Sequence, residues 1–198
     1  MEPPISSRAV GPHLKFVDDF LSYTILRFIP HTVSPNAITV VRFILVPVVM
    51  VLLLLESYAW GAAVFAIAAL TDALDGAMAR TRGQITVWGI IADPLADKLL
   101  IGVTALILVT RYVGLGVAGI LIGIELLLVA RATYRYAQGR NAGANAMGKT
   151  KMVLQSAALF ALFVYVLSGS AFFLTLATGG LYLAIFFALV SLFVAPSA

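Results

Sequence analysis

Four aspartates, Asp72, Asp75, Asp93 and Asp97, interrupt a stretch of sequence that is otherwise apolar enough to cross a membrane. Asp72 and Asp75 are three residues apart, and Asp93 and Asp97 are four apart, so the members of each pair share one face of a helix. Carboxylates that are close together in a medium of low dielectric constant repel one another strongly. The stretch therefore predicts that a positive partner lies among them.

A divalent cation suits such a cluster. Hard oxygen ligands favour Mg²⁺, Mn²⁺ or Ca²⁺, and the absence of cysteine from the chain and of histidine from the neighbourhood of the aspartates argues against zinc. Mg²⁺ is usually held by a few carboxylates together with water and substrate phosphates. The cluster thus predicts a phosphate-bearing substrate and one or two metal ions.

Small residues accompany the aspartates on the same helical faces. Gly76, Ala79 and Gly89 leave space in which a flat ligand can approach the backbone. The alternative is that they allow close packing of membrane helices. Because these small residues lie beside four carboxylates, we favour the interpretation that they line a ligand pocket.

Two other interpretations of the aspartates stay open. They can form a buried network of ion pairs with the basic residues around them, or they can mark the path of an ion or proton-coupled transporter. We favour the metal site because the carboxylates are regularly spaced and gather at one end of the predicted bundle. The basic residues that such a network would use are Arg42, Arg80, Arg82 and Lys98.

The elements that must position these residues are membrane helices. Apolar residues make up 62% of the 198 residues and charged residues 11%, which excludes an ordinary soluble domain. Segments long enough to cross a bilayer occur at about 36–56, 58–80, 87–110, 114–137, 150–168 and 171–194. We therefore expect an all-α membrane protein with six transmembrane helices, in which residues 1–198 form a single domain and about 36–194 form the bundle.

The distribution of basic residues predicts the orientation. Nearly all of them fall at the ends of the segments that face the same side as the N-terminus, and Arg111 lies opposite. By the positive-inside rule, both termini and the aspartate end of the bundle face the cytoplasm. Residues 14–29 have apolar positions at helical spacing and predict an amphipathic helix that lies in the membrane interface ahead of the first span.

The sequence around the aspartates resembles the signature of the CDP-alcohol phosphotransferase family. "DALDGAMAR" and "GIIADPLAD" match the pattern D-x-x-D-G-x-x-A-R followed by G-x-x-x-D-x-x-x-D at every defined position. "SPNAITVVR" resembles the family's opening segment, which here carries Asn36, Thr39 and Arg42. "IADPLADKLL" and "GKTKM" are similar to segments of the phosphatidylglycerophosphate synthases within that family.

The resemblance implies a reaction and a role for each matched residue. A phosphatidyl group passes from CDP-diacylglycerol to an alcohol, and CMP is released. Asp72, Asp75 and Asp93 bind two Mg²⁺ or Mn²⁺ ions, and Asp97 is the general base and also touches the second ion. The CMP pocket is lined by Gly76, Ala79, Arg80 and Gly89, with Asn36 and Thr39 from the opening segment.

The acceptor alcohol is predicted from basic residues on the cytoplasmic side. Arg131, Lys149 and Lys151 suit a phosphate, although each also fits the positive-inside rule or a contact with anionic lipid. We favour glycerol 3-phosphate, with inositol phosphate and phosphatidylglycerol as alternatives. These synthases commonly read A-R-E where this chain has Ala132 after Arg131, which keeps the alternatives open.

Glu125, an isolated acid in the fourth segment, is either functional or hydrogen-bonded to a neighbouring helix. We expect an enzyme of the bacterial cytoplasmic membrane, surrounded by membrane lipids and without a nucleic-acid partner. The resemblance further implies a homodimer.

Overall fold

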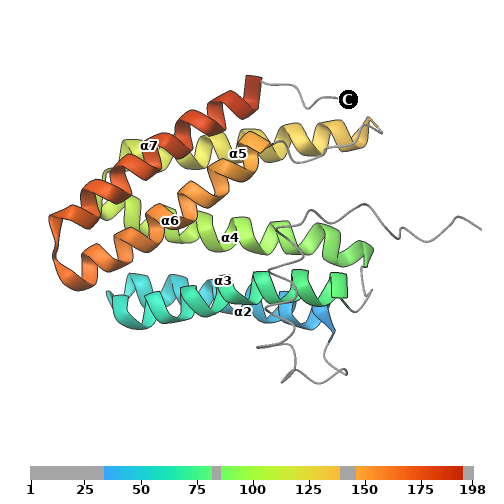
Figure 1. Ribbon diagram of the computed structural model, residues 1–198, viewed down its shortest axis with the longest axis horizontal. Coiled ribbons are helices and arrows are strands. Elements are labelled where there is room, and N and C mark those ends of the chain that lie inside the picture. Colours follow the sequence, from blue (N-terminus) through green and yellow to red (C-terminus); the bar gives the residue numbers. More distant parts are fainter. Residues whose placement is uncertain (1–33, 82–85, 139–145, 194–198) are drawn as a thin grey trace, which may run out of the picture. The chain divides into compact units, whose positions relative to one another are not determined.

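The computed structural model describes residues 34–81, 86–138 and 146–193, and within these ranges every regular element is an α-helix (Figure 1). The all-helical class predicted from the sequence is confirmed, and the helices begin and end within a few residues of the predicted segments. The interfacial helix expected at 14–29 lies outside the described residues. The helices are α2 (Pro35–Leu54), α3 (Tyr58–Thr81), α4 (Val87–Tyr112), α5 (Leu115–Ala137), α6 (Ala146–Ser168) and α7 (Ala171–Phe193).

Five helices of the described part are long and apolar enough to cross a membrane, and the chain is a multi-pass membrane protein. α4 differs because every stretch of 18 residues within it contains at least three charged side chains. That α4 is a sixth span therefore stays a prediction. The charged residues of α4 are Asp93, Asp97, Lys98 and Arg111.

Local capping chemistry sets the ends of the helices. Ser34 precedes α2, and its Oγ accepts a hydrogen bond from the backbone N–H of Ala37 at 3.3 Å, as an N-cap residue does. Pro35 takes the first helical position, where no N–H is needed. After α6, Gly169 has a φ of 69°, and its N–H donates to the carbonyl of Tyr165 at 2.7 Å. Glycine adopts this left-handed conformation readily, so it ends the helix.

The described residues form two compact units. The first consists of residues 34–45, 66–81 and 86–97, and the second of residues 46–65, 98–138 and 146–193. α2, α3 and α4 thus contribute to both units. That the whole chain is one domain stays a prediction.

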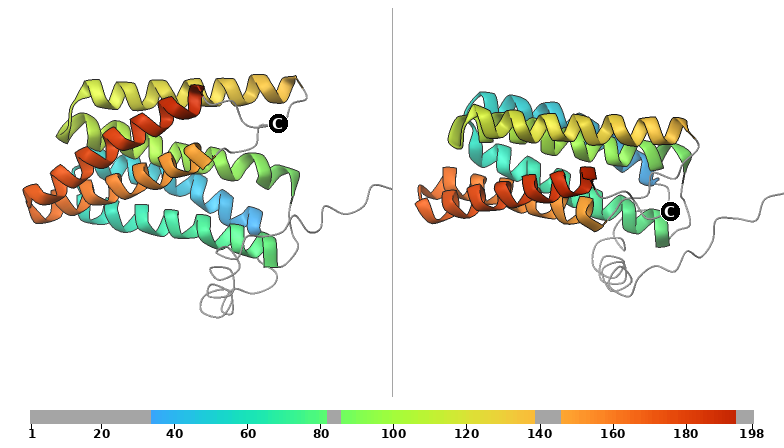
Figure 2. Two further views of the ribbon diagram at one scale, coloured as in Figure 1. Left: turned by 45° about the horizontal axis from the view of Figure 1, so that its top comes forward. Right: turned by 90° about the horizontal axis from the view of Figure 1, so that it is seen from above.

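Within the second unit, α6 and α7 pack along each other, and α5 also contacts α7 (Figure 2). Gly180 of α7 lies against Ala158 of α6, and a Cβ atom added to Gly180 would be 3.1 Å from the Cβ of Ala158. Membrane helices approach closely where small residues face each other, because dispersion contacts between backbones replace contacts with lipid. The close approach of α6 and α7 therefore depends on the missing side chain at Gly180.

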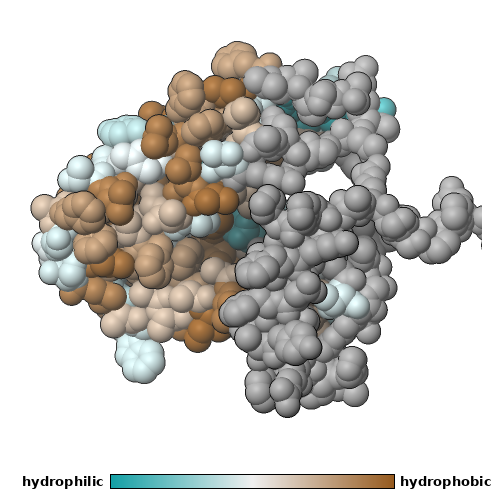
Figure 3. All heavy atoms as spheres, in the orientation of Figure 1, coloured by the Kyte–Doolittle hydropathy of each residue, from teal (hydrophilic) through white to brown (hydrophobic). Residues whose placement is uncertain are grey.

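Large apolar side chains are exposed on the described helices, and Figure 3 shows apolar residues over much of the visible face. Leu126 of α5 is 65% exposed and Phe186 of α7 is 59% exposed. Soluble monomers seldom expose apolar surface on this scale, whereas lipid tails solvate it well. The exposed faces are those expected of helices in contact with lipid.

We predict that Gly180→Leu lowers the free energy of unfolding by about 1–3 kcal/mol, because the new side chain must push Ala158 and α6 away. Gly179→Leu is the matched control, since a Cβ at Gly179 meets no atom within 4 Å. Unfolding of both purified variants in detergent, followed by circular dichroism, measures the difference. Equal losses in the two variants would contradict this account of the α6–α7 contact.

Candidate active site

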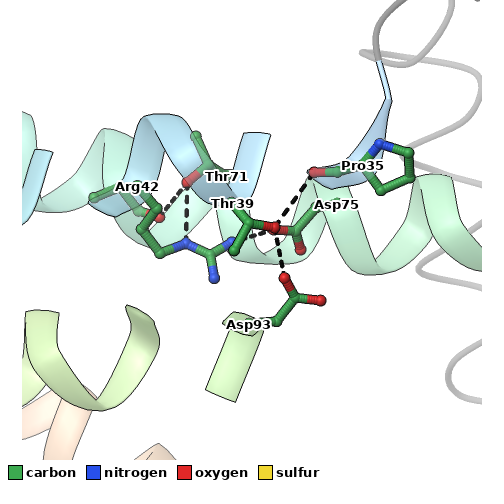
Figure 4. Close-up of polar contacts among 7 residues, drawn as sticks. Pro35, Thr39, Arg42, Thr71, Asp75 and Asp93 are labelled. Carbon is green, nitrogen blue, oxygen red and sulfur yellow. Dashed lines mark hydrogen bonds and ion pairs between the residues drawn. The ribbon is translucent and has the colours of Figure 1, made fainter. Parts of the chain in front are cut away.

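The site begins at Thr39, which is 1% exposed on α2 in the first unit. Its Oγ1 lies 2.5 Å from Oδ1 of Asp93 on α4 and 3.4 Å from Oδ2 of Asp75 on α3 (Figure 4). It also lies 3.3 Å from the carbonyl oxygen of Pro35, one turn earlier on α2. One hydroxyl therefore joins three helices and brings two of the four aspartates together.

The Thr39 hydroxyl has one proton for these three acceptors. The shortest contact shows the proton donated to Asp93. The oxygen of Asp75 then faces a lone pair on Thr39 rather than its proton. Two carboxylates and a hydroxyl that lie close together form a set of hard oxygen donors, which suits a divalent cation, so the residues present fit the metal expected here.

A buried ion pair lies beside this hydroxyl. Nη2 of Arg42 on α2 donates to Oδ2 of Asp75 at 2.6 Å, and the side chains are 0% and 2% exposed. Nε of Arg42 donates to Oγ1 of Thr71 at 3.3 Å, and Thr71 donates its own proton to the carbonyl of Ala68 at 2.6 Å. A buried charge is stable only when it is paired and hydrogen-bonded, and Arg42 and Asp75 satisfy that condition for each other.

A second set of contacts connects the start of α4 to the start of α2. Thr86 caps α4, because its Oγ1 accepts a hydrogen bond from the N–H of Gly89 at 3.0 Å. The Thr86 hydroxyl donates to Oδ1 of Asn36 at 2.8 Å. A Cβ atom at Gly89 would lie 3.1 Å from Oγ1 of Thr86, 3.3 Å from Oδ1 of Asn36 and 3.5 Å from Oδ2 of Asp93. Gly89 therefore leaves room at the point where three oxygen atoms converge.

The other residues predicted for the site lie on the same helices. Asp97 follows Asp93 by one turn on α4 and is half-buried, and Gly76 follows Asp75 on α3. The structure thus brings Asp75 and Asp93 together, and the roles of all these residues stay predictions. Three further predicted residues belong to α3, with side chains outside the described part: Asp72, Ala79 and Arg80.

Two of the three basic residues expected to bind an acceptor phosphate have protein partners in the second unit. Nζ of Lys151 on α6 forms an ion pair with Oε2 of Glu125 on α5, and the Lys151 side chain is 6% exposed. Nη1 of Arg131 donates to the backbone carbonyls of Ser191 and Leu192 in the last turn of α7, where a positive charge is favourable. Lys149 lies on α6, and its side chain is outside the described residues.

The structure adds contacts that the sequence patterns did not specify. Thr71 and Thr86 are not among the predicted site residues. Thr86 lies immediately before the predicted third span, so the preference of threonine for N-cap positions could have identified it. Glu125 is bonded to a neighbouring helix, which was one of its two expected explanations. No local sequence pattern could predict that Glu125 pairs with Lys151, because these residues are 26 positions apart.

Comparison with known proteins identifies the class of protein that has this arrangement of helices and carboxylates. A family model described as CDP-alcohol phosphatidyltransferase matches residues 32–190, which include every residue of the site described above. The chain belongs to the CDP-alcohol phosphatidyltransferase family.

Individual relatives carry one name, CDP-diacylglycerol–glycerol-3-phosphate 3-phosphatidyltransferase. The protein of that name from Pseudomonas fluorescens is 39% identical over 112 residues, which are 54% of this chain and 57% of the relative. The one from Bacillus subtilis (strain 168) is 31% identical over 174 residues, 79% of this chain and 90% of the relative. A chloroplastic form from Oryza sativa subsp. japonica is 36% identical over 104 residues, 52% of this chain and 32% of the relative. The matched region thus spans little more than half the length of the P. fluorescens relative and about a third of the length of the O. sativa relative.

We predict that Glu125→Leu and Lys151→Met each lower the free energy of unfolding by about 3 kcal/mol, because each leaves a buried charge without its counter-ion. The double variant should lose less than the sum of the single losses, since neither charge is then left alone. Denaturant unfolding of the four proteins gives the coupling energy. Additive losses would show that the ion pair contributes no coupling.

Proposed function

We propose that this protein transfers the phosphatidyl group of CDP-diacylglycerol to glycerol 3-phosphate, releasing CMP and forming phosphatidylglycerophosphate. The observation that carries the proposal is the convergence of Asp75 and Asp93, from the two halves of the family motif, on the Thr39 hydroxyl. The names of the relatives from P. fluorescens and B. subtilis support glycerol 3-phosphate as the acceptor.

Four aspartates are proposed to hold two Mg²⁺ or Mn²⁺ ions: Asp72, Asp75, Asp93 and Asp97. When bound, such ions offset the negative charge of the pyrophosphate and of departing CMP. The convergence of Asp75 and Asp93 on one hydroxyl supports this assignment, since hard oxygen donors that lie close together suit an ion of this kind.

The residues of the chain then have distinct tasks. Asp97 accepts the proton of the acceptor hydroxyl as its oxygen attacks the phosphorus attached to diacylglycerol, because an alcohol at neutral pH is a poor nucleophile. The bond that breaks joins this phosphorus to the oxygen that leaves with CMP. The acyl chains stay attached to the product and remain in the membrane. The nucleotide lies against Gly76, Ala79, Arg80 and Gly89, with Asn36 and Thr39 at its edge.

The phosphate of the acceptor is proposed to bind Arg131, Lys149 and Lys151. Glu125 is compatible with this role for Lys151, because a carboxylate partner offsets the cost of burying the ammonium group. An ammonium has three protons, so Lys151 can donate to Glu125 and to a phosphate together.

The proposed topology has six transmembrane helices, with α4 among them, and an interfacial helix at 14–29. The distribution of basic residues supports a topology in which both termini and the aspartates are at the cytoplasmic face of a bacterial cytoplasmic membrane. The active form is proposed to be a homodimer. A water-soluble acceptor then reaches the site from the cytoplasm, while CDP-diacylglycerol reaches it from the bilayer.

We predict that the purified protein releases CMP from CDP-diacylglycerol when Mg²⁺ and glycerol 3-phosphate are both present. Parallel reactions with inositol phosphate and with phosphatidylglycerol test the alternative acceptors, and proteoliposomes without CDP-diacylglycerol test ion flux. CMP and the lipid product are measured by chromatography. Release with a different acceptor alone would overturn the acceptor assignment, and flux without any CMP release would overturn the reaction.

We predict that Asp97→Asn lowers kcat by at least about 100-fold, because the amide cannot accept the proton of the acceptor. The KM for CDP-diacylglycerol should change little, since the nucleotide pocket keeps its residues. Lys98→Gln is a neighbouring control that alters charge next to Asp97 without removing the base. A normal kcat in Asp97→Asn would refute the role of Asp97.

A further inference from the structure

Arg42 is the one charged residue of α2, and its side chain is 0% exposed. An apolar side chain of similar volume would fill this position without the cost of removing a guanidinium group from water. Packing therefore does not explain why an arginine lies here. The explanation must come from what its charge contacts.

Two contacts of the Arg42 guanidinium are with residues on one face of α3. Thr71 and Asp75 are four positions apart, so they lie one above the other on that helix. The proton of Thr71 is donated to Ala68, so the Thr71 oxygen can accept a hydrogen bond from Nε of Arg42 at 3.3 Å. Nη2 is then directed at Oδ2 of Asp75, 2.6 Å away. The planar geometry of arginine serves both contacts at once, which the single ammonium of lysine would not reproduce.

We propose that Arg42 is a built-in counter-ion of the carboxylate site, a positioning residue that holds Asp75 in place before any divalent cation binds. The inference rests on the proposed function for the assignment of Asp75 as a metal ligand. Two cations then act on one carboxylate, a permanent one from α2 and an exchangeable one from solution. Because both neutralise the same negative charge, loss of the permanent cation makes the fold depend more strongly on the exchangeable one.

The test compares thermal unfolding of wild-type protein, Arg42→Gln and Arg42→Lys in detergent, each with and without saturating Mn²⁺ and without CDP-diacylglycerol. Without Mn²⁺, Arg42→Gln should lose roughly 5–10 °C in Tm, because the buried carboxylate of Asp75 loses its ion pair with Arg42. With Mn²⁺, Arg42→Gln should recover at least about half of that loss, so its Mn²⁺-induced rise in Tm exceeds that of wild type. Arg42→Lys keeps the charge and should show a rise between the other two.

Two control variants separate the charge effect from general damage. Thr71→Val removes the hydrogen bond from Nε of Arg42 and leaves the ion pair with Asp75, so its Mn²⁺-induced rise should equal that of wild type. Arg111→Gln breaks an exposed ion pair with Glu56 in the second unit, where no change in the response to Mn²⁺ is expected.

Equal Mn²⁺-induced rises in Arg42→Gln and wild type would overturn the proposal, because Arg42 would then only support packing. Failure of Arg42→Gln to fold in either condition would overturn it as well, whereas folding only with Mn²⁺ would support it. The readout needs no turnover, so it is separate from the reaction. Absence of CMP release by wild type would refute the proposed function. A larger Mn²⁺-induced rise in Tm for Arg42→Gln than for wild type would still support the role of Arg42.

Discussion

The structure depends on ion pairs between helices, because a charge inside a membrane helix needs a partner on another helix. Arg42 on α2 pairs with Asp75 on α3, and Lys151 on α6 pairs with Glu125 on α5. In each pair the basic side chain is almost completely buried, so neither group is stable without the other. Such pairs fix which helices are neighbours and in what register, because an ion pair tolerates far less sliding than a contact between apolar side chains.

Hydroxyl groups extend this rule from pairs to a site. Thr39 places one oxygen among Asp75, Asp93 and the carbonyl of Pro35, and Thr86 connects the first turn of α4 to Asn36. A threonine hydroxyl adds no charge, and it both donates and accepts. It can therefore lie between acidic groups without adding to their repulsion. Thr39 thereby helps to orient Asp75 and Asp93 without adding a charge, while Arg42 pairs with Asp75.

Much of this could be predicted from the sequence, and the limits have physical causes. The bounds of the helices follow from apolar runs and from caps such as Ser34, which are local signals. The spacing of the aspartates indicates which helical faces carry them. The partners of Lys151 and Arg131 could not be predicted, because contacts between residues 26 and 60 positions apart depend on how helices pack. Thr39 was predicted for the nucleotide pocket, whereas its contacts in the structure are with the carboxylates themselves.

α4 has the most charged residues of the described helices, and three of its polar contacts are with residues that come earlier in the chain. Asp93 of α4 is bonded to Thr39, the cap of α4 is bonded to Asn36, and Arg111 at its far end pairs with Glu56 at 2.7 Å. All three partners precede α4, so they have already been synthesised when α4 leaves the ribosome. A helix with this many charges is a poor candidate for insertion alone. α2 and the turn before α3 supply hydrogen bonds at the start of α4 and an opposite charge near its end, so these polar groups have partners when α4 packs. The order of the chain thus makes these partners available before α4 itself is made.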